Sequence, residues 1–278
     1  MQWRCRERLI DLGSPVVMGI LNVTPDSFSD GGRYAAADRA FDRSVEMVAE
    51  GAAIIDVGGE STRPGAESVA AETEIERVVP VIERITRSLD VAVSIDTCKP
   101  KVMEAALAAG ACIVNDVCAL RARGARELVA GAGAGVCLMH MQGEPRTMQL
   151  DPRYEDVVAE VRDFLDEQRR LTITAGVRAE SIVLDPGIGF GKRLPHNLAL
   201  LRELGALTAL GAPVLVGVSR KGMIGAVLGR GPGERLHGGL GLAALAVAKG
   251  ARVVRTHDVA PTWDAIRMVD AVERGARE

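Results

Sequence analysis

Polar residues follow short apolar runs at nearly regular intervals along this chain, and their types could support chemistry. They are Asn22, Asp56, Asp96, Asn115, His140, Asp185, Ser219 and His257. Each could simply cap a helix or form a turn. From Asn22 to His257 the chain advances 257 − 22 = 235 residues in seven steps, and a step of about 34 residues is the length of one β/α unit. This spacing predicts that the polar groups gather at one edge of a parallel sheet.

Two carboxylates and an amide in this set, Asp96, Asn115 and Asp185, suit a flat heterocycle with several N–H donors. A guanidine-like ring edge would take a bidentate contact from a carboxylate, which is a strong charge-assisted interaction. An acid/base pair, as in glycoside hydrolysis, is the alternative. Spacing alone does not separate the two interpretations.

Basic residues follow the last two apolar runs. Lys221 lies in GVSRKG, and Arg255 and His257 lie in RTHDV. The loops after the seventh and eighth strands of a barrel often bind phosphate. Strand one neighbours strand eight in a closed barrel, so Asn22 is expected beside Arg255 and His257. We therefore predict a local anion site.

Three loops are unusually rich in glycine and proline. The first loop, MGILNVTPDSFSDGG, carries Phe28, which we interpret as a lid residue that stacks on a flat substrate. The second loop, IIDVGGESTRPGA, carries Arg63, which could hold an anion or a carboxylate. LDPGIGFGK, with Phe190, matches neither a dinucleotide fingerprint nor a P-loop. We interpret it as a backbone wall against a flat ligand.

Strands and helices alternate in the pattern. Strands are expected at 16–21, 52–57, 91–95, 111–114, 135–139, 181–184, 213–216 and 251–254, and helices at 38–50, 71–88, 99–109, 124–132, 154–174, 196–207, 234–249 and 260–273. Asp38 is a candidate N-cap, and Gly51, Gly110, Gly176 and Gly250 are candidate C-caps. Eight β/α units in this length predict an α/β fold, a (β/α)8 TIM barrel, as a single domain over residues 1–278.

Composition narrows the class of protein. A hydrophobic fraction of 47% supports one large core, and a net charge of −3 gives no support for a nucleic-acid or membrane partner. No apolar run approaches the ~20 residues that span a bilayer. The five cysteines form no C-x-x-C pair, which favours reduced thiols in the cytoplasm.

Metal chemistry is constrained by the histidines. The four in the chain form no H-x-x-x-H pair, which argues against zinc. Magnesium stays open, because it needs only one amide oxygen and substrate phosphates.

The motifs resemble one enzyme family in order from Val16 to Val259, which is nearly the whole chain. They are MGILNVTPDSFSDGG, IIDVGGESTRPGA, VSIDT, VNDV, LMHMQGEPRTMQ, LDPGIGFGK, GVSRKGMIG and RTHDV. Together they are similar to the bacterial dihydropteroate synthases, and the first two motifs are long and specific. The resemblance implies a transferase of folate biosynthesis that joins 6-hydroxymethyl-7,8-dihydropterin diphosphate to 4-aminobenzoate and releases diphosphate. It also implies Mg²⁺, competition by sulfonamides and a homodimer.

The resemblance also implies roles for individual residues. The pterin would be held by Asp96, Asn115, Asp185 and Lys221. The diphosphate would be bound by Asn22, Arg255 and His257, with Asn22 also contacting magnesium. The aminobenzoate pocket would be formed by Phe28, Thr62, Arg63, Pro64, Phe190 and Lys221. Catalysis is expected from Asp96, Asp185, Lys221 and Arg255.

Two positions depart from the family pattern. Gly222 stands where members often have serine, and Gly238–Gly239 replaces a more usual Gly-Ser pair.

Two other functions fit parts of the pattern. A Schiff-base aldolase could use Lys221 at a strand end, but the long first two loops have no role in an aldolase. A non-catalytic pterin-binding protein, or a methyltransferase domain that binds a methylated folate, would need no diphosphate site. The presence of Arg63, Arg255 and His257 argues against that class.

Overall fold

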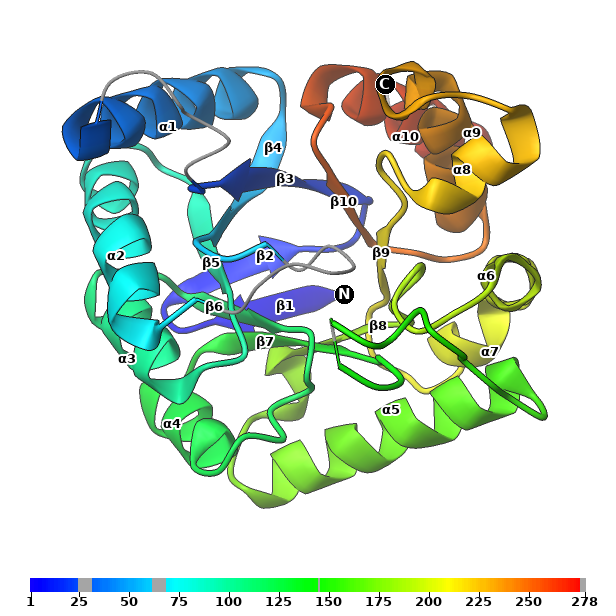
Figure 1. Ribbon diagram of the computed structural model, residues 1–278, viewed down its shortest axis with the longest axis horizontal. Helices are drawn as coiled ribbons and strands as arrows, with labels where there is room; N and C mark the ends of the chain where they lie inside the picture. The colour runs from blue at the N-terminus through cyan, green and yellow to red at the C-terminus, as the bar shows by residue number, and fades with distance from the viewer. Residues whose placement is uncertain (25–31, 62–68, 145, 276–278) are drawn as a thin grey trace.

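In the computed structural model, parallel strands form the wall of a barrel. The structure describes residues 1–24, 32–61, 69–144 and 146–275, and for residues 32–36 it describes the backbone alone. The wall comprises β3 (Val16–Asn22), β4 (Ala52–Gly58), β5 (Ala92–Asp96), β6 (Ile113–Asp116), β7 (Gly135–Met139), β8 (Ile182–Asp185), β9 (Leu215–Gly217) and β10 (Val253–Thr256). Their order is β8-β7-β6-β5-β4-β3-β10-β9 (Figure 1). A parallel bridge between Leu184 and Val214 joins the two ends of this sheet. The predicted TIM barrel is confirmed.

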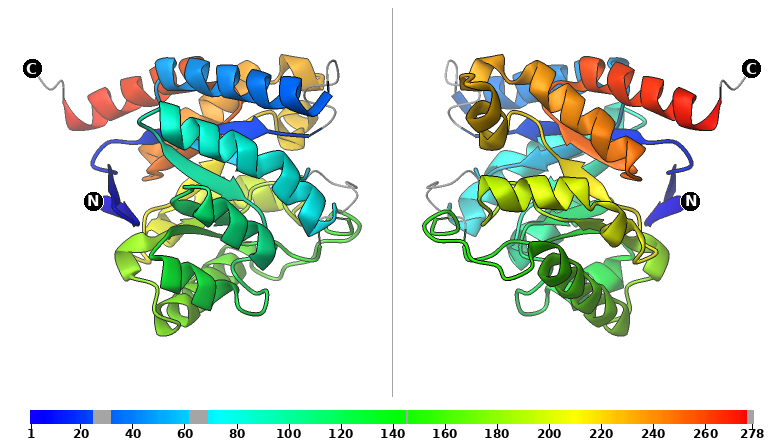
Figure 2. Two further views of the ribbon diagram at one scale, coloured as in Figure 1. Left: turned by 90° about the vertical axis from the view of Figure 1, so that its left-hand side faces the viewer. Right: turned by 90° about the vertical axis from the view of Figure 1, so that its right-hand side faces the viewer.

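Helices surround the barrel on its outside, as the side views of Figure 2 show. They are α1 (Gly32–Ala49), α2 (Ala71–Ser88), α3 (Pro100–Ala108), α4 (Ala125–Ala132), α5 (Val157–Thr174), α6 (Leu194–Arg202), α7 (Gly205–Thr208), α8 (Gly222–Leu228), α9 (Leu236–Ala248) and α10 (Val259–Arg274), with 3₁₀ turns η2 (Ala179–Ser181) and η3 (Pro232–Glu234). Four helix-ending glycines, Gly51, Gly110, Gly176 and Gly250, have φ between 98° and 109°. These predicted C-caps are therefore confirmed as positive-φ positions, which a side chain would disfavour. No helix in the described ranges is long and apolar enough to cross a membrane.

Some predicted boundaries were wrong. The first helix begins at Gly32, so Asp38 lies inside α1 and is not its N-cap. The helix expected at 196–207 is divided into α6 and α7, with Gly205 opening the second segment. The short helix α8 was not expected, because seven residues carry too little periodicity to recognise.

An antiparallel hairpin, β1 (Gln2–Cys5) with β2 (Arg8–Asp11), was also not predicted, and it closes the amino-terminal end of the barrel. The Trp3 side chain is fully buried, and its indole N–H donates to the carbonyl oxygen of Ser181, the last residue of η2 (2.9 Å). Trp3, Cys5 and Leu12 pack with inward-facing residues of the barrel strands. One end of the barrel is thus filled with apolar side chains, and the polar residues are left for the other end.

Candidate active site

A row of polar residues lies in one layer across four neighbouring strands at the carboxyl end of the barrel. The strand register pairs Asn22 with Gly58, Gly58 with Asp96, and Asp96 with Asn115. A Cβ atom built on Gly58 would lie 3.7 Å from Asn22 Oδ1 and 3.8 Å from Asp96 Oδ2. The glycine therefore leaves the amide and carboxylate oxygens facing one shared space. Asn22, Asp96 and Asn115 therefore lie together at the carboxyl end of the barrel, where the spacing predicted that strand-end polar residues gather.

Arg255 links this layer to a second buried carboxylate. Its side chain leaves β10 and reaches across the barrel interior, where Nε donates to Asp56 Oδ2 (2.7 Å) and Nη2 donates to Asp96 Oδ2 (2.6 Å). Asn115 Nδ2 donates to the same Asp56 oxygen (3.0 Å). Asp56, which is fully buried, thus holds both the guanidinium and the amide in place.

Each of the two carboxylates retains an acceptor. Asp56 Oδ1 and Asp96 Oδ1 are buried, and neither has a hydrogen-bond partner among the described residues. Burial raises the pKa of Asp96 to about 7, although Arg255 opposes the shift and Asp56 reinforces it. A buried acceptor without a donor is costly, so this corner favours a ligand that brings N–H groups or positive charge.

Asp185 and Lys221 lie on the other side of the mouth. Asp185 accepts a hydrogen bond from the Gly187 backbone N–H (2.7 Å), which limits the rise in pKa that burial causes in this carboxyl group. Burial lowers the pKa of Lys221 to about 8, and Asp185 opposes that shift. Lys221 Nζ lies 4.2 Å from the centre of the Phe190 ring, a distance typical of a cation–π contact. Lys221 therefore lies close to both Asp185 and Phe190.

The loop after β8 is tied down by a buried lysine that the sequence did not single out. Lys192 Nζ donates to the carbonyl oxygens of His140 (3.2 Å), Gly187 (3.0 Å) and Phe190 (3.0 Å) and contacts His140 Nδ1 (2.9 Å). Burial lowers the pKa of Lys192 to about 7 and that of His140 to about 3. Lys192 therefore fixes the segment that carries Phe190.

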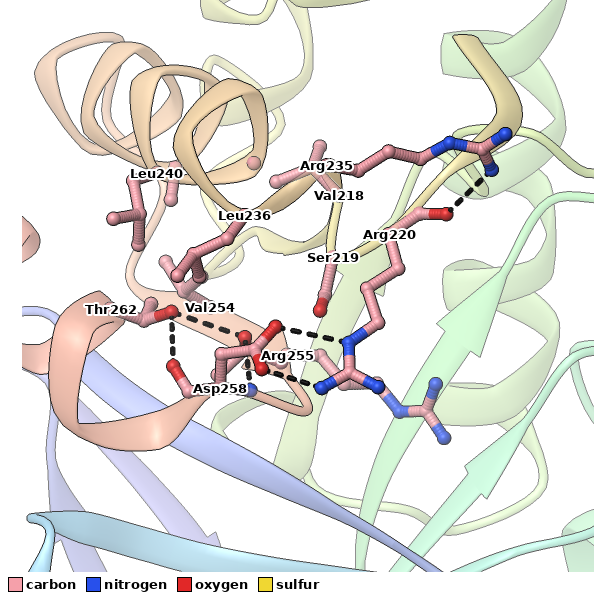
Figure 3. Close-up of a pocket in the computed structure, with 13 residues that line it drawn as sticks. Val218, Ser219, Arg220, Arg235, Leu236, Leu240, Val254, Arg255, Asp258 and Thr262 are labelled. Carbon is pink, nitrogen blue, oxygen red and sulfur yellow. Dashed lines mark hydrogen bonds and ion pairs between the residues drawn. The ribbon is translucent and has the colours of Figure 1, made fainter. Parts of the chain in front are cut away.

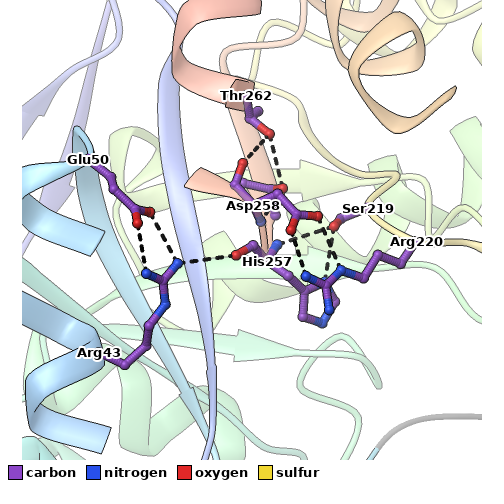
Figure 4. Close-up of polar contacts among 8 residues, drawn as sticks. Arg43, Glu50, Ser219, Arg220, His257, Asp258 and Thr262 are labelled. Carbon is purple, nitrogen blue, oxygen red and sulfur yellow. Dashed lines mark hydrogen bonds and ion pairs between the residues drawn. The ribbon is translucent and has the colours of Figure 1, made fainter. Parts of the chain in front are cut away.

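The rim beside β10 contains the predicted anion residue His257. Its Nδ1 lies 3.0 Å from Ser219 Oγ, which also accepts the His257 backbone N–H (3.2 Å). Figure 4 shows these residues next to Arg220, whose guanidinium is bonded to both oxygens of Asp258 (2.6 and 3.1 Å). Ser219 therefore orients the imidazole while Asp258 holds the neighbouring guanidinium.

A small pocket lies where the ends of β9 and β10 meet α9 and α10 (Figure 3). Ser219, Arg220 and Arg255 contribute to its lining, with Leu236 and Leu240 on the opposite side. The pocket therefore adjoins the cationic rim.

Several predicted site residues cannot be placed. Phe28, Thr62, Arg63 and Pro64 lie outside the described residues. Their assignment to an aminobenzoate pocket stays a prediction.

The two departures from the family pattern have different structural settings. Gly222 is exposed at the first position of α8, and a Cβ atom added there would meet no neighbouring group within 4 Å, so a serine would fit. A Cβ atom on Gly238 would lie 2.4 Å from Ile224 Cγ2, which is a clash. A Cβ atom on Gly239 would lie 3.9 Å from its nearest neighbour, Ile224 Cδ1, which is an ordinary contact. Gly238 is thus required for the close packing of α9 on α8, and Gly239 is not.

A partly buried cluster of charged residues lies beside the ends of β4 and β5. Glu74 on α2 is fully buried, and its Oε2 lies 2.6 Å from Lys99 Nζ, which also pairs with Glu60. Lys99 follows β5 by three residues and Glu60 follows β4 by two. Sequence reasoning missed this cluster, because charged residues in helices and loops usually face solvent.

Comparison with known proteins decides the family. Residues 18–257 match the family model described as "Pterin binding enzyme". The dihydropteroate synthase of Escherichia coli K12 is 50% identical over 262 residues, covering 94% of this chain and 93% of the relative. The chain belongs to the dihydropteroate synthase family.

Solved dihydropteroate synthases share the fold over almost the whole length. The Yersinia pestis enzyme with a sulfonamide drug has a TM-score of 0.93 at 44% identity, covering 98% of this chain and 99% of that one. The Xanthomonas albilineans enzyme with 4-aminobenzoic acid has a TM-score of 0.93 at 46% identity, covering 99% of both chains. As a member of the dihydropteroate synthases, the chain is a transferase, and the Schiff-base aldolase and the non-catalytic pterin-binding protein are set aside.

Proposed function

We propose that the mouth of this barrel condenses 6-hydroxymethyl-7,8-dihydropterin diphosphate with 4-aminobenzoate to give 7,8-dihydropteroate and diphosphate, a step of folate biosynthesis. The observation that carries the assignment is the set of buried acceptors, Asp96, Asn115 and Asp185, gathered beside the guanidinium of Arg255 in a chain of this family. The relative from Xanthomonas albilineans was solved with 4-aminobenzoic acid, which supports the second substrate.

The pterin ring suits the acidic side of the mouth. Asp185 and Asn115 can take its guanidine-like edge, and Lys221 can donate to the ring carbonyl. When the bond between the methylene carbon and the diphosphate oxygen breaks, positive charge spreads over the electron-rich dihydropterin. Ionised Asp96 and Asp185 then stabilise that charge in a site shielded from water.

The leaving diphosphate suits the cationic side. The guanidinium of arginine has five N–H donors, and Arg255 directs two of its nitrogens to Asp56 and Asp96. The remaining N–H donors of Arg255, together with His257 and the amide N–H of Asn22, can stabilise the negative charge that develops on the leaving diphosphate. The amine of aminobenzoate is uncharged near neutral pH, so its attack needs no strong general base.

Magnesium fits the same corner. Mg²⁺ binds through one or two protein oxygens together with substrate phosphates, and Asn22 Oδ1 faces the shared space at Gly58. Within the described ranges there is no group of three or more His, Cys, Asp or Glu able to hold a metal without substrate. Bound with the diphosphate, the ion would offset the charge of the leaving group.

The aminobenzoate pocket is proposed to involve Phe190 and Lys221, together with Phe28, Thr62, Arg63 and Pro64. The close contact of Lys221 with the Phe190 ring supports a site that takes an aromatic carboxylate. A sulfonamide drug is bound in the Yersinia pestis relative. We therefore expect sulfonamides to compete with aminobenzoate here.

We further propose a homodimer formed through α8, α9 and α10. Of the eleven large apolar side chains that are exposed in the described structure, five lie on these three helices: Val227, Leu228, Leu245, Met268 and Val272. Helix α9 is almost entirely apolar, yet only Ala243, Ala246 and Val247 are buried. A second chain would cover such a surface. We also propose a cytoplasmic location, which the five unpaired thiols favour.

The proposal is tested by following diphosphate release with both substrates and Mg²⁺. Release is expected to require all three, and Arg255→Ala is expected to lower kcat/KM by about 10²–10³, the effect of removing one preorganised charge-stabilising group. Arg252→Ala, just before the opposite end of β10, is the matched control and should retain activity. Protein that binds the pterin diphosphate but never releases diphosphate with aminobenzoate would refute the assignment.

A further inference from the structure

Two free cysteines belong to a sulfur-rich cluster at the barrel mouth that is separate from the main core. Cys98 and Cys118 are both partly exposed. They pack against one set of buried side chains, namely Val117, Met139, Met141 and Met148. The two thiols therefore share one apolar environment and are each partly exposed.

The strand register brings the two cysteines together. Asp96 on β5 pairs with Asn115 on β6, and the Thr97 backbone N–H donates to the Asn115 carbonyl oxygen (3.1 Å). Cys98 and Cys118 follow this pair by two and three residues. Both cysteines therefore lie in the first loop residues past the ends of two neighbouring strands, β5 and β6. Each of the two thiols shifts the pKa of the other, which indicates that their sulfurs are close neighbours.

The two sulfurs have different chemical characters. The neighbouring Cys98 thiol lowers the pKa of Cys118, burial and the Asp116 carboxylate oppose this shift, and Arg121 adds to it. Arg121 is held close because its Nε donates to the Cys118 carbonyl oxygen (3.0 Å). The interaction of the two thiols raises the pKa of Cys98. A partly exposed thiol whose pKa is lowered, beside a second thiol and a guanidinium, is a usual setting of a redox-sensitive cysteine.

The other cysteines of the chain provide an internal contrast. Cys5, Cys112 and Cys137 are buried, and burial raises the pKa of each thiol. Buried thiols of this kind are inert. Any selective thiol chemistry should therefore occur at Cys98 and Cys118.

We propose that Cys98 and Cys118 form a redox-active pair that closes reversibly to a disulfide by exchange with a small-molecule disulfide such as oxidised glutathione. The Cys118 thiolate attacks one sulfur of the oxidant, whose S–S bond breaks and releases one thiolate that takes a proton from water. Cys98 then loses its proton and attacks the Cys118 sulfur, which releases the second small thiol. Two protein thiols and one small disulfide become one protein disulfide and two small thiols.

The experiment exposes the folded protein to oxidised glutathione, blocks remaining thiols in denaturant and maps the products by mass spectrometry. Wild-type protein is expected to lose two of its five titratable thiols, to contain a peptide pair linked through Cys98 and Cys118, and to regain both thiols with dithiothreitol. Cys98→Ser should stop at a glutathione adduct on Cys118, because the resolving thiol is absent. Cys118→Ser should leave Cys98 unmodified. If a serine variant fails to fold, the alanine variant of the same cysteine, Cys98→Ala or Cys118→Ala, is used in its place with the same expected result.

Three outcomes would overturn the proposal. They are wild-type protein that stops at a glutathione adduct, a linkage to Cys5, Cys112 or Cys137, and a Cys118→Ser protein that is modified at Cys98. Because each readout is a covalent product, none depends on the enzyme's substrates or on its activity.

Discussion

At the scale of single residues, the site depends on one guanidinium shared by two buried carboxylates. Removing charges from water costs several kcal/mol for each ion, and good geometry is needed to offset that cost. Arg255 provides this geometry, because its Nε lies 2.7 Å from Asp56 Oδ2 and its Nη2 lies 2.6 Å from Asp96 Oδ2. Asp56 is not itself a predicted substrate-binding residue, but it bonds two of them, Arg255 and Asn115, and therefore acts as their positioning residue.

The raised pKa of Asp96 predicts a pH dependence of stability. The ordinary value for this carboxyl group is 3.8, and in the folded protein it is about 7. Between these two values the folded state binds more protons than the unfolded state, so the contribution of Asp96 to stability falls as the pH rises through this window. Asp96→Asn cannot titrate and should gain stability relative to wild type from pH 4 to pH 7 in urea unfolding. Parallel curves for the two proteins would contradict the prediction.

The buried lysine under the loop after β8 gives a second prediction. Lys192→Met keeps the length of the side chain but removes the donor from the carbonyl oxygens of His140 and Phe190, while the Gly187 oxygen keeps only its bond from the Phe190 N–H. An unpaired buried acceptor costs about 1–3 kcal/mol, which the loop can relieve by moving Phe190. We expect kcat/KM for aminobenzoate to fall by about ten- to a hundredfold, mainly through KM.

The control for this substitution is Lys101→Met, which removes an exposed lysine paired with Glu72 on the surface. A surface change of this kind should alter stability by no more than about 0.5 kcal/mol. Equal steady-state kinetics for the two methionine variants would show that Lys192 does not position the loop.

At the scale of secondary structure, the sequence predicts elements that are long or strongly patterned. The apolar runs locate the barrel strands, because strands buried on both faces are continuously apolar and rich in β-branched residues. The hairpin at 2–11 escaped prediction because QWRCRERLID has more charged than apolar residues, and its stability comes from packing against the barrel. The contact of Arg255 with Asp56 joins positions 199 residues apart, which no local pattern reports.

The hairpin is predicted to contribute stability and not catalysis. Trp3→Ala removes a fully buried indole together with its bond to Ser181, and such changes cost about 3–5 kcal/mol. Urea unfolding should show this loss while kcat stays unchanged, because β1 and β2 close the end of the barrel opposite to the mouth. Leu9→Ala on β2, where the side chain is 49% exposed, is the matched control. A large fall in kcat for well-folded Trp3→Ala would refute the division between the two ends.

At the scale of the whole molecule, the barrel separates three surfaces with different roles. The amino-terminal end is filled by the hairpin, and the carboxyl end gathers the charged groups of the site. The outer face formed by α8, α9 and α10, which lie side by side in Figure 1, carries apolar side chains that no part of the described chain covers. A pattern of this kind is expected of a protein that buries one helical face against a second copy.

The dimer prediction can be tested with two substitutions of the same type at similarly exposed leucines. Leu245→Glu on α9, where the side chain is 40% exposed, places a charge within the proposed interface. Leu171→Glu on α5, at 44% exposure, places one outside it. Burying an unpaired charge is strongly unfavourable, so Leu245→Glu should sediment as a monomer at concentrations where wild type and Leu171→Glu sediment as dimers. The urea midpoint of Leu171→Glu should rise with protein concentration, as expected for a dimer, whereas that of Leu245→Glu should not. Wild-type protein that is monomeric throughout, or a Leu245→Glu dimer as tight as wild type, would show that this face does not join two chains.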